Sequence, residues 1–352
     1  MGKGRMKIGI LTAGGDCPGL NAAIRGVGKT AVLKYGHEVI GFSSGFLGLI
    51  RNEYKQLDEL ALSGILTIGG TILGSSREKP FKHTEYDKYI KSKPKIIQEN
   101  YKALGLDCLV CIGGNGTQKT AYRLSQLGLN VVGIPKTIDN DVWGTDLTFG
   151  FDSAVSIAAE AIDRLHSTAN SHRRIMVVEL MGHTAGWLAL HAGVAGGGDV
   201  ILIPEIPYKI KVISEYLIRR CEEGKPYSIV VVAEGIKLPD KRNGTPRKVP
   251  AGAYIANQIL KKTGLETRET ILGYIQRGGS PTARDRIAAT EFGAHAAEMI
   301  HRGEYGKMTA YKGYKLVGIP LSDVAGKTKT IPRKHPLVLH ARSLGTCFGD
   351  SP

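Results

Sequence analysis

The sequence predicts an α/β protein made of two doubly wound, Rossmann-like domains with parallel sheets. Short apolar runs recur along the chain, and most are followed by glycine and then by a segment with helical spacing of its apolar residues. These runs are continuous rather than alternating, which is typical of strands covered by helices on both faces. The length of 352 residues fits about two domains. Ligands of such sheets bind at the carboxyl ends of the strands, so the loops there are the candidates for function.

Eight apolar runs bounded by turn-forming residues are predicted to be strands. They cover residues 7–12, 38–42, 107–112, 130–134, 174–180, 199–203, 227–233 and 270–275. Between the fourth and fifth of these, apolar residues at helical spacing predict a helix over 153–166, with Asp152 or Ser153 as its N-cap. A second helix is expected to begin near Asn21, after the first strand.

Composition and cysteine usage indicate a globular protein of a reducing compartment. Hydrophobic residues make up 42% and charged residues 22% of the chain, and no run of 18 apolar residues occurs. The basic N-terminus leads into a strand-like segment rather than a signal peptide, so we expect a cytoplasmic protein without a membrane segment. The five cysteines are scattered and suggest no disulfide framework. Cys108 and Cys111 have metal-site spacing, but they lie in an apolar run and are expected to be core residues.

The formal net charge of +15 indicates which kinds of partner the protein could bind rather than which fold it has. Nucleic acid, a membrane surface and phosphorylated metabolites could each explain it. Aromatic residues make up only 7% of the chain and are not interleaved with the basic residues as base-stacking platforms would be. We therefore expect no nucleic-acid partner.

Two glycine-rich turns follow predicted strands and are suited to phosphate binding. The first includes Gly14 and Gly15, and the second covers residues 113–117. Glycine lets the backbone approach a ligand closely, and exposed amides attract phosphate. Neither turn matches the P-loop or the dinucleotide-binding consensus, and each taken alone could be no more than a tight turn.

The loop at residues 135–141 places two carboxylates, Asp139 and Asp141, beside Thr137 and Lys136 after a strand. One carboxylate could accept the proton of an attacking hydroxyl while the other orients a magnesium ion, the division of labour that phosphoryl transfer requires. In isolation the same residues could form an ordinary Asx-rich turn. Five arginines that could bind phosphate complete the inventory, namely Arg77, Arg173, Arg174, Arg268 and Arg277.

Taken together, these motifs resemble the phosphofructokinase family, which phosphorylates the 1-hydroxyl of fructose 6-phosphate with ATP or pyrophosphate. The resemblance covers nearly the whole chain. It is carried by LTAGGDCPGLNAAIR (11–25), IGGNGT (112–117), GIPKTIDND (133–141), EAIDRL (160–165), ELMGH (179–183), AEG (233–235) and LGYIQRGGSP (272–281).

The resemblance implies that Asp139 is the base, with Thr137 and Asp141 beside it at the transferring phosphoryl group and the metal. It implies that the phosphoryl donor is held by Gly15, Arg77, Gly114, Asn115, Gly116 and Thr117. It implies sugar-phosphate contacts within one chain by Met181, Gly182, His183, Glu234, Tyr274 and Arg277. Arg174 and Arg268 match residues that reach the sugar phosphate from a neighbouring subunit, so we expect a homodimer or homotetramer.

The same resemblance implies two domains with the active site in the cleft between them. Residues 1–150 with about 276–325 would bind the phosphoryl donor, and 151–275 with about 326–352 would bind the sugar phosphate. Magnesium would be the cofactor, with Asn115 and Asp141 as its ligands.

Several positions depart from the family pattern and leave alternatives open. Asn115 stands where the family usually has Asp, His183 where many members have Arg, and Tyr274 where many bacterial ATP users have His. Gly116 resembles ATP users, because the pyrophosphate users commonly have a bulky, charged Asp there, whereas Lys136 resembles pyrophosphate and mixed-donor members. We expect ATP-dependent transfer to fructose 6-phosphate in glycolysis. Pyrophosphate dependence and a weakly catalytic regulatory paralogue that binds sugar phosphate and nucleotide are the alternatives.

Overall fold

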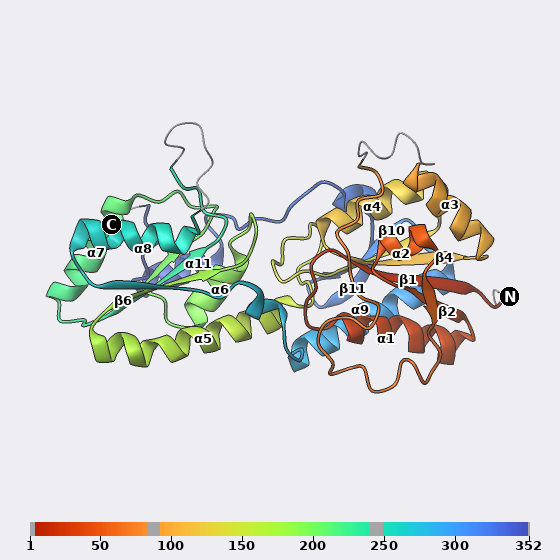
Figure 1. Ribbon diagram of the computed structural model, residues 1–352, viewed down its shortest axis with the longest axis horizontal. Helices are drawn as coiled ribbons and strands as arrows, with labels where there is room; N and C mark the ends of the chain where they lie inside the picture. The colour runs from red at the N-terminus through yellow and green to blue at the C-terminus, as the bar shows by residue number, and fades with distance from the viewer. Residues whose placement is uncertain (1–3, 83–91, 240–248, 351–352) are drawn as a thin grey trace. The chain divides into compact units, whose positions relative to one another are not determined.

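The computed structural model describes residues 4–82, 92–239 and 249–350. The chain divides into two compact units, which can be followed by colour in Figure 1. Unit 1 comprises Met1–Ser153 and Arg277–Lys329, and unit 2 comprises Ala154–Gln276 and Thr330–Pro352. The roles predicted for the two units remain predictions.

Unit 1 contains a mixed seven-stranded sheet in the order β11-β10-β5-β4-β1-β2-β3. The five inner strands pair in parallel, while β3 and β11 join the two edges in antiparallel pairs. The strands are β1 (Lys7–Ala13), β2 (Glu38–Phe42), β3 (Tyr54–Gln56), β4 (Cys108–Gly113), β5 (Val131–Pro135), β10 (Lys307–Lys312) and β11 (Lys315–Pro320).

Helices cover both faces of this sheet. Figure 1 shows α1 (Leu20–Lys29) and α9 (Ala283–Arg302) on one side, and α2 (Phe46–Arg51), α3 (Lys93–Ala103) and α4 (Asn115–Gln126) on the other. The π-helix η1 (Thr30–Lys34) continues α1, and the short α10 (Leu321–Val324) packs on α4. Because β1, β4 and β5 lie side by side in parallel, the loops that follow them meet at one edge of the sheet.

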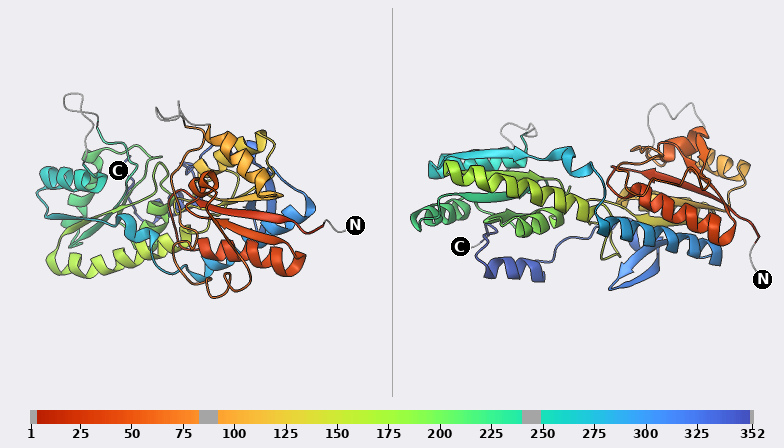
Figure 2. Two further views of the ribbon diagram at one scale, coloured as in Figure 1. Left: turned by 45° about the vertical axis from the view of Figure 1, so that its right-hand side comes forward. Right: turned by 90° about the horizontal axis from the view of Figure 1, so that it is seen from below.

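Unit 2 contains a four-stranded parallel sheet in the order β7-β8-β6-β9. Its strands are β6 (Ile175–Leu180), β7 (Val200–Leu202), β8 (Ser228–Ala233) and β9 (Thr267–Ile271). The left view in Figure 2 shows the long α5 (Phe151–His172) along one side of this sheet and α8 (Ala251–Thr263) on the other. The remaining helices are α6 (Trp187–Ala195), α7 (Ile210–Glu222), the 3-10 helix η3 (Gly273–Arg277) and α11 (Pro336–Ser343).

The predicted fold class is confirmed, and seven of the eight predicted strands are observed within one residue of their expected ends. The prediction for residues 270–275 is wrong in register, because the strand β9 spans Thr267–Ile271 and a 3-10 helix follows it. β9 is an edge strand with an exposed, polar sequence, and Gly273 has a φ of 50° that ends the extended backbone. Of the apolar residues after β9, Leu272 is buried but Tyr274 and Ile275 are exposed, so this run does not mark a covered strand.

The long helix α5 was predicted correctly, but its predicted N-cap is wrong. The helix begins at Phe151, so Asp152 and Ser153 lie inside its first turn. Their side chains instead form hydrogen bonds with Thr282, just before α9, and with Asp285, in the first turn of α9. The Thr282 hydroxyl donates to the Asp152 carboxylate at 2.7 Å, and the Ser153 hydroxyl donates to the Asp285 carboxylate at 2.6 Å.

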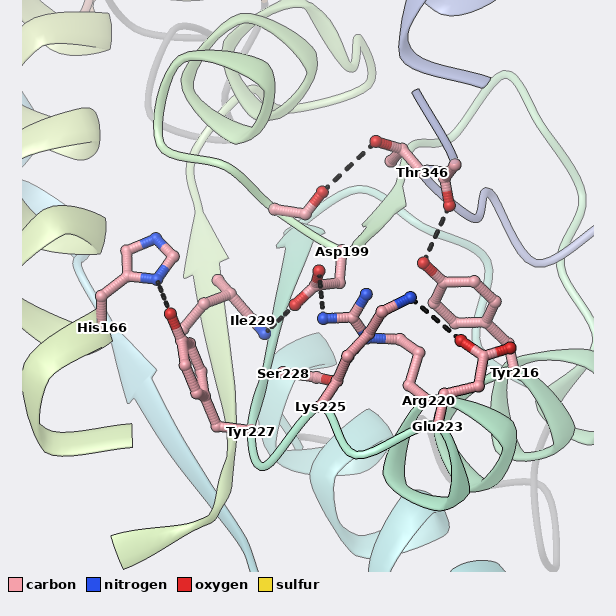
Figure 3. A network of polar contacts seen from close by, with 12 residues as sticks. His166, Asp199, Tyr216, Arg220, Glu223, Lys225, Tyr227, Ser228, Ile229 and Thr346 are labelled. Atoms are coloured by element: carbon pink, nitrogen blue, oxygen red, sulfur yellow. Dashed lines mark hydrogen bonds and ion pairs between the residues drawn. The ribbon is translucent and has the colours of Figure 1, made fainter. Parts of the chain in front are cut away.

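The C-terminal segment is tied to unit 2 by a polar network at the amino ends of β7 and β8 (Figure 3). Asp199 forms an ion pair of 2.6 Å with Arg220 and accepts the Ile229 backbone N–H at 2.9 Å. The Tyr216 hydroxyl donates to the Gly345 carbonyl at 2.8 Å, so α7 holds the chain end in place. Residues 330–352 are therefore an integral part of unit 2.

Cys108 and Cys111 are fully buried in β4 as free thiols, which confirms their predicted core role. Burial raises the pKa of both thiols well above their ordinary value, so neither is poised to be a thiolate nucleophile or metal ligand. Within the three described ranges, the helices are all too short or too polar to cross a bilayer.

Candidate functional site

The predicted phosphate-binding turns meet in unit 1 around a hollow of about 180 Å³. It is formed by the ends of β1, β4 and β5, the start of α4 and the end of η3. The lining residues are Gly14, Gly15, Gly114, Asn115, Gly116, Thr117, Lys136, Thr137, Asp139, Asp141 and Arg277. The structure thus brings together nearly all the catalytic and donor residues that the sequence singled out in the first half of the chain.

The second glycine-rich segment is a helix N-terminus rather than a free loop. Gly114 is extended at the N-cap, and Asn115, Gly116 and Thr117 form the first turn of α4. Their backbone N–H groups have no partners within the helix, and the helix dipole adds positive potential at this end. This end of α4 lies at the hollow, so it offers donors to an anion there.

The first glycine-rich turn is held against Arg277 and Lys136. The guanidinium donates to the Asp16 carbonyl at 3.0 Å, and a Cβ at Gly15 would lie only 2.7 Å from Arg277 Nη1. Glycine at position 15 is what allows this close approach. The Lys136 ammonium donates to the Gly15 carbonyl and is buried, which lowers its pKa below the ordinary lysine value. Two cations therefore lie against one turn.

The acidic loop after β5 forms the third wall of the hollow. The Asp139 backbone N–H donates to Thr137 Oγ1 at 3.1 Å, and the Thr137 carbonyl accepts the Thr148 hydroxyl at 2.9 Å. Asn140, between the two aspartates, has a φ of 48°. The loop is thus a tight, internally bonded turn that also presents two carboxylates to the hollow. The catalytic and the Asx-turn interpretations of the sequence are compatible.

Asn115 lies beside Asp141 in this hollow. Its side-chain N–H donates to the Asp141 carboxylate at 2.8 Å and to the Asp141 carbonyl at 3.2 Å. Its amide oxygen, Oδ1, is buried and accepts no hydrogen bond from any described residue. Across the described part of the chain, no three His, Cys, Asp or Glu side chains gather closely enough to hold a metal ion by themselves.

A larger hollow of about 460 Å³ adjoins the first and shares Gly14, Gly116 and Thr117 with it. Arg77 lines it, as predicted for a donor-binding residue. The sequence analysis missed the rest of its wall, which includes Phe46, Lys79, Phe81, Lys119, Thr120 and Arg123. The Arg123 guanidinium lies 3.9 Å from the centre of the Phe81 ring. Positions 116, 120 and 123 share one face of a helix, a spacing that could have revealed part of this wall.

In unit 2, part of the predicted substrate set lies at the carboxyl ends of β6, β8 and β9. Glu234, after β8, accepts the backbone N–H groups of Gly182 and His183 at 3.2 and 2.8 Å. Gly182 has a φ of 144° and His183 one of 51°, so this bonding holds an unusual turn after β6 next to Met181. Tyr274, in η3, is 75% exposed.

Arg174 and Arg268 lie at the other end of the same sheet, where the strands β6 and β9 begin. Arg174 precedes β6, Arg268 is the second residue of β9, and the two strands pair with Met176 opposite Arg268. Both guanidinium groups contact one oxygen of Glu266, at 3.0 and 2.7 Å. The Arg174 contact lowers the pKa of this carboxyl. The run from Arg174 to Met181 spans about 23 Å at the rise of a strand, so a sugar phosphate cannot contact both sets within one copy of unit 2.

The phosphofructokinase family model matches residues 7–300. "ATP-dependent 6-phosphofructokinase 3" of Bacteroides thetaiotaomicron is 59% identical over 344 residues, covering 98% of this chain and all of that protein. "ATP-dependent 6-phosphofructokinase" of Spirochaeta thermophila is 58% identical and covers 97% of each chain.

Solved structures agree. The chain superimposes on phosphofructokinase from Saccharomyces cerevisiae with a TM-score of 0.79 and 32% identity, covering 91% of this chain and 45% of the yeast chain. It therefore spans less than half of that larger protein. A pyrophosphate-dependent phosphofructokinase from Nitrosospira multiformis shares the fold, with a TM-score of 0.83, 23% identity and coverage of 98% and 93%. On its motifs, its fold and this full-length similarity, the chain belongs to the phosphofructokinase family.

Proposed function

We propose that the protein transfers the γ-phosphoryl group of ATP to the 1-hydroxyl of fructose 6-phosphate in glycolysis. The observation that carries this proposal is the position of Asp139, which lines the same hollow as the N-terminus of α4 and the Gly14–Gly15 turn. A proton acceptor and a set of phosphate-binding amides are thereby combined in one place, as phosphoryl transfer to a hydroxyl requires. The names of the relatives, ATP-dependent 6-phosphofructokinases, support this reaction.

The chemistry follows from what each group can do. The Asp139 carboxylate accepts the proton of the sugar 1-hydroxyl as its oxygen attacks the γ-phosphorus, and the bond from that phosphorus to the β–γ bridging oxygen breaks to release ADP. Arg77, Arg277 and Lys136, with the amides at the start of α4, neutralise the negative charge of the phosphates. Most of the catalytic effect then comes from positioning and electrostatic stabilisation.

The shape of unit 1 supports a nucleotide as the donor. The larger hollow has room and an aromatic wall for a nucleoside, next to the smaller hollow for the phosphates. A Cβ at Gly116 would have no neighbour within 4 Å, so the space between the two hollows is open. Pyrophosphate is the second candidate donor, favoured by Lys136, which lies at the hollow and resembles the residue of the pyrophosphate-using and mixed-donor members.

The residues present fit a magnesium ion. Magnesium in phosphoryl-transfer sites is commonly bound by one or two carboxylates together with substrate phosphates and water. Asp141 and the buried Oδ1 of Asn115, which lacks a partner among the described residues, would supply oxygen ligands. When bound, the ion would neutralise charge on the phosphates. An amide is a weaker ligand than a carboxylate, so Asn115 is expected to lower the magnesium affinity rather than abolish binding.

The sugar phosphate is proposed to bind at the carboxyl edge of the unit 2 sheet, with Met181, Gly182, His183, Glu234 and Tyr274 around it. Arg174 and Arg268 cannot join them from the same sheet edge, so we propose that a second copy of the chain supplies these two arginines in a homodimer or homotetramer. Planar guanidinium groups suit a phosphate dianion. We also propose a cytoplasmic location, because five free cysteines, four of them buried, suit a reducing compartment.

The test is an assay of the purified protein with magnesium, fructose 6-phosphate and either ATP or pyrophosphate, with fructose 1,6-bisphosphate measured directly. We expect product with ATP. If product forms with pyrophosphate but not with ATP, pyrophosphate is the donor. If neither donor gives product, the protein is not this transferase, and the alternative of a regulatory paralogue that binds sugar phosphate and nucleotide is favoured. Asn115 and His183, which depart from the family pattern, are the reason for that alternative.

A further inference from the structure

Asn140 is the least relaxed residue of the acidic loop. It stands between Asp139 and Asp141 with a left-handed φ of 48°, which few residues other than glycine adopt and which the surroundings must hold. Its side-chain oxygen accepts the Thr148 backbone N–H at 3.2 Å and the Lys329 ammonium at 3.0 Å. The conformation of the turn is therefore set by these two donors.

Lys329 reaches this loop from a segment 189 residues further along the chain. Besides Asn140, its ammonium donates to the Thr145 carbonyl at 2.9 Å and the Asp146 carbonyl at 3.0 Å. An ammonium has three N–H donors, and here each has an oxygen acceptor. Burial lowers the pKa of Lys329 to about 8, so the ammonium is still the main form at neutral pH.

The backbone around Lys329 also grips the loop. The Lys329 N–H donates to the Asp141 carbonyl at 2.8 Å, and Thr328 forms an antiparallel bridge with Val142. Lys329 thus bonds to the main chain of Asp141 and to the side chain of Asn140, two adjacent residues of the turn that carries the two carboxylates. Lys329 is absent from the walls of both hollows, so its effect on the reaction would pass through the loop.

We propose that Lys329 is a positioning residue for the phosphoryl transfer, which sets the orientation of Asp139 and Asp141 through Asn140. The inference rests on the proposed function. Since Lys329 holds the loop and not a substrate, its loss should alter the transition state more than ground-state binding. A displacement of about 1 Å of a catalytic group can cost on the order of a hundredfold in rate.

The first variant is Lys329→Met, which keeps the length of the side chain and removes its donors. We expect kcat to fall about tenfold to a hundredfold, with KM values for fructose 6-phosphate and ATP within about twofold of wild type. Lys327→Met is the matched control, because Lys327 is exposed on the same segment and should leave kcat unchanged. Rates are expressed per folded enzyme, measured by circular dichroism, so that a purely structural loss of folded protein does not count.

The second variant is Asn140→Gly, which removes the acceptor but tolerates the positive φ. We expect a similar fall in kcat, and a double variant no slower than the slower single one, because both remove the same link. If Lys329→Met does not fold, Lys329→Gln and Asn140→Gly are compared in its place with the same expectation.

Three results would overturn the inference. One is a kcat per folded Lys329 variant equal to that of Lys327→Met. Another is a double variant whose loss of kcat equals the product of the losses in the two single variants. The third is a change confined to KM. A wild-type protein that makes no product would overturn the proposed function itself and this inference with it, so the two failures are distinguishable.

Discussion

The two units arrange their functional residues in different ways. In unit 1 the predicted catalytic and donor residues follow β1, β4 and β5 or lie in α4 and η3, and all but Arg77 line one hollow. In unit 2 the predicted sugar-phosphate residues divide between the two ends of one sheet, with Glu234 at the carboxyl edge and Arg174 and Arg268 at the amino edge. One chain would therefore supply the whole proposed donor site but only part of the proposed acceptor site.

The difference indicates which activities depend on assembly. The hollow of unit 1 is built from contacts within one chain, so donor binding should survive in an isolated subunit. The arginines of unit 2 are paired with Glu266 at the amino edge of the sheet, and in our proposal they bind a sugar phosphate held by another copy of the chain. Phosphoryl transfer should then require the oligomer even though binding of the donor does not.

The largest expected effect is the loss of the base in unit 1. Asp139→Ser should lower kcat by about a thousandfold or more, because the attacking hydroxyl loses its proton acceptor. Binding of fructose 6-phosphate, measured by isothermal titration, should stay within about threefold, since Asp139 lies in the donor unit. Asp163→Ser, on the exposed face of α5, is the control and should change neither quantity.

Near-normal turnover of Asp139→Ser would show that the assigned base is wrong. A large loss of sugar-phosphate affinity in that variant would instead break the division of labour between the two units.

The next effect tests whether Arg268 acts on another copy of the chain. Arg268→Ala should raise KM for fructose 6-phosphate by about tenfold or more, because one charge-assisted hydrogen bond to the phosphate is lost. When subunits of the Arg268→Ala and Asp139→Ser variants are mixed and reassembled, each hybrid dimer has one site that contains neither substitution. Equal mixing should therefore restore about a quarter of wild-type activity in a twofold assembly.

The matched negative control mixes Asp139→Ser with Asp141→Ala, which both lie in unit 1 of the same site. This mixture should gain nothing. If the Arg268 mixture gains nothing either, Arg268 serves its own chain or no site, and the comparison between the two units fails.

The sequence predicts the fold best where strands are buried on both faces. β6, β8 and the edge strand β7 are continuous, fully buried apolar runs and were predicted within one residue. β3, β9, β10 and β11 carry polar or partly exposed side chains and gave no such pattern. Strands without a continuous apolar run are identified poorly by propensity and periodicity.

The candidate site shows the same contrast between local and distant residues. Gly15, Asn115 and Asp139 follow predicted strands, so the parallel-sheet topology alone places them together. Lys329 has no local pattern, and its contact with Asn140 joins segments that only the tertiary fold brings together. Likewise, the position of Arg174 and Arg268 at the amino edge follows from the strand direction, but the expectation that they act on a second chain came only from the family resemblance.

The smallest expected effect concerns stability in acid, because unit 1 contains a buried histidine, His37, in contact with the half-buried His301. His37 Nδ1 accepts the Met6 N–H at 3.2 Å, and its Nε2 lies 3.4 Å from His301 Nδ1, whose ring stacks on Tyr35. Burial, with a smaller contribution from His301 and opposed by Asp107, lowers the pKa of His37 below its ordinary value.

The unfolded chain therefore binds more protons than the folded one below about pH 6.5, and unit 1 loses stability as the pH falls through that range. Hydrogen exchange of β1, corrected for intrinsic rates, should show protection falling between about pH 7 and pH 5.5, with β8 of unit 2 as the internal reference. His37→Asn keeps an acceptor for the Met6 N–H but cannot titrate, so its β1 protection should fall less steeply, whereas His340→Asn, at an exposed position, should follow wild type. Equal pH slopes in wild type and His37→Asn would mean that protonation of His37 does not govern the acid response, since His37 is the titrating ring that bonds the chain at the start of β1.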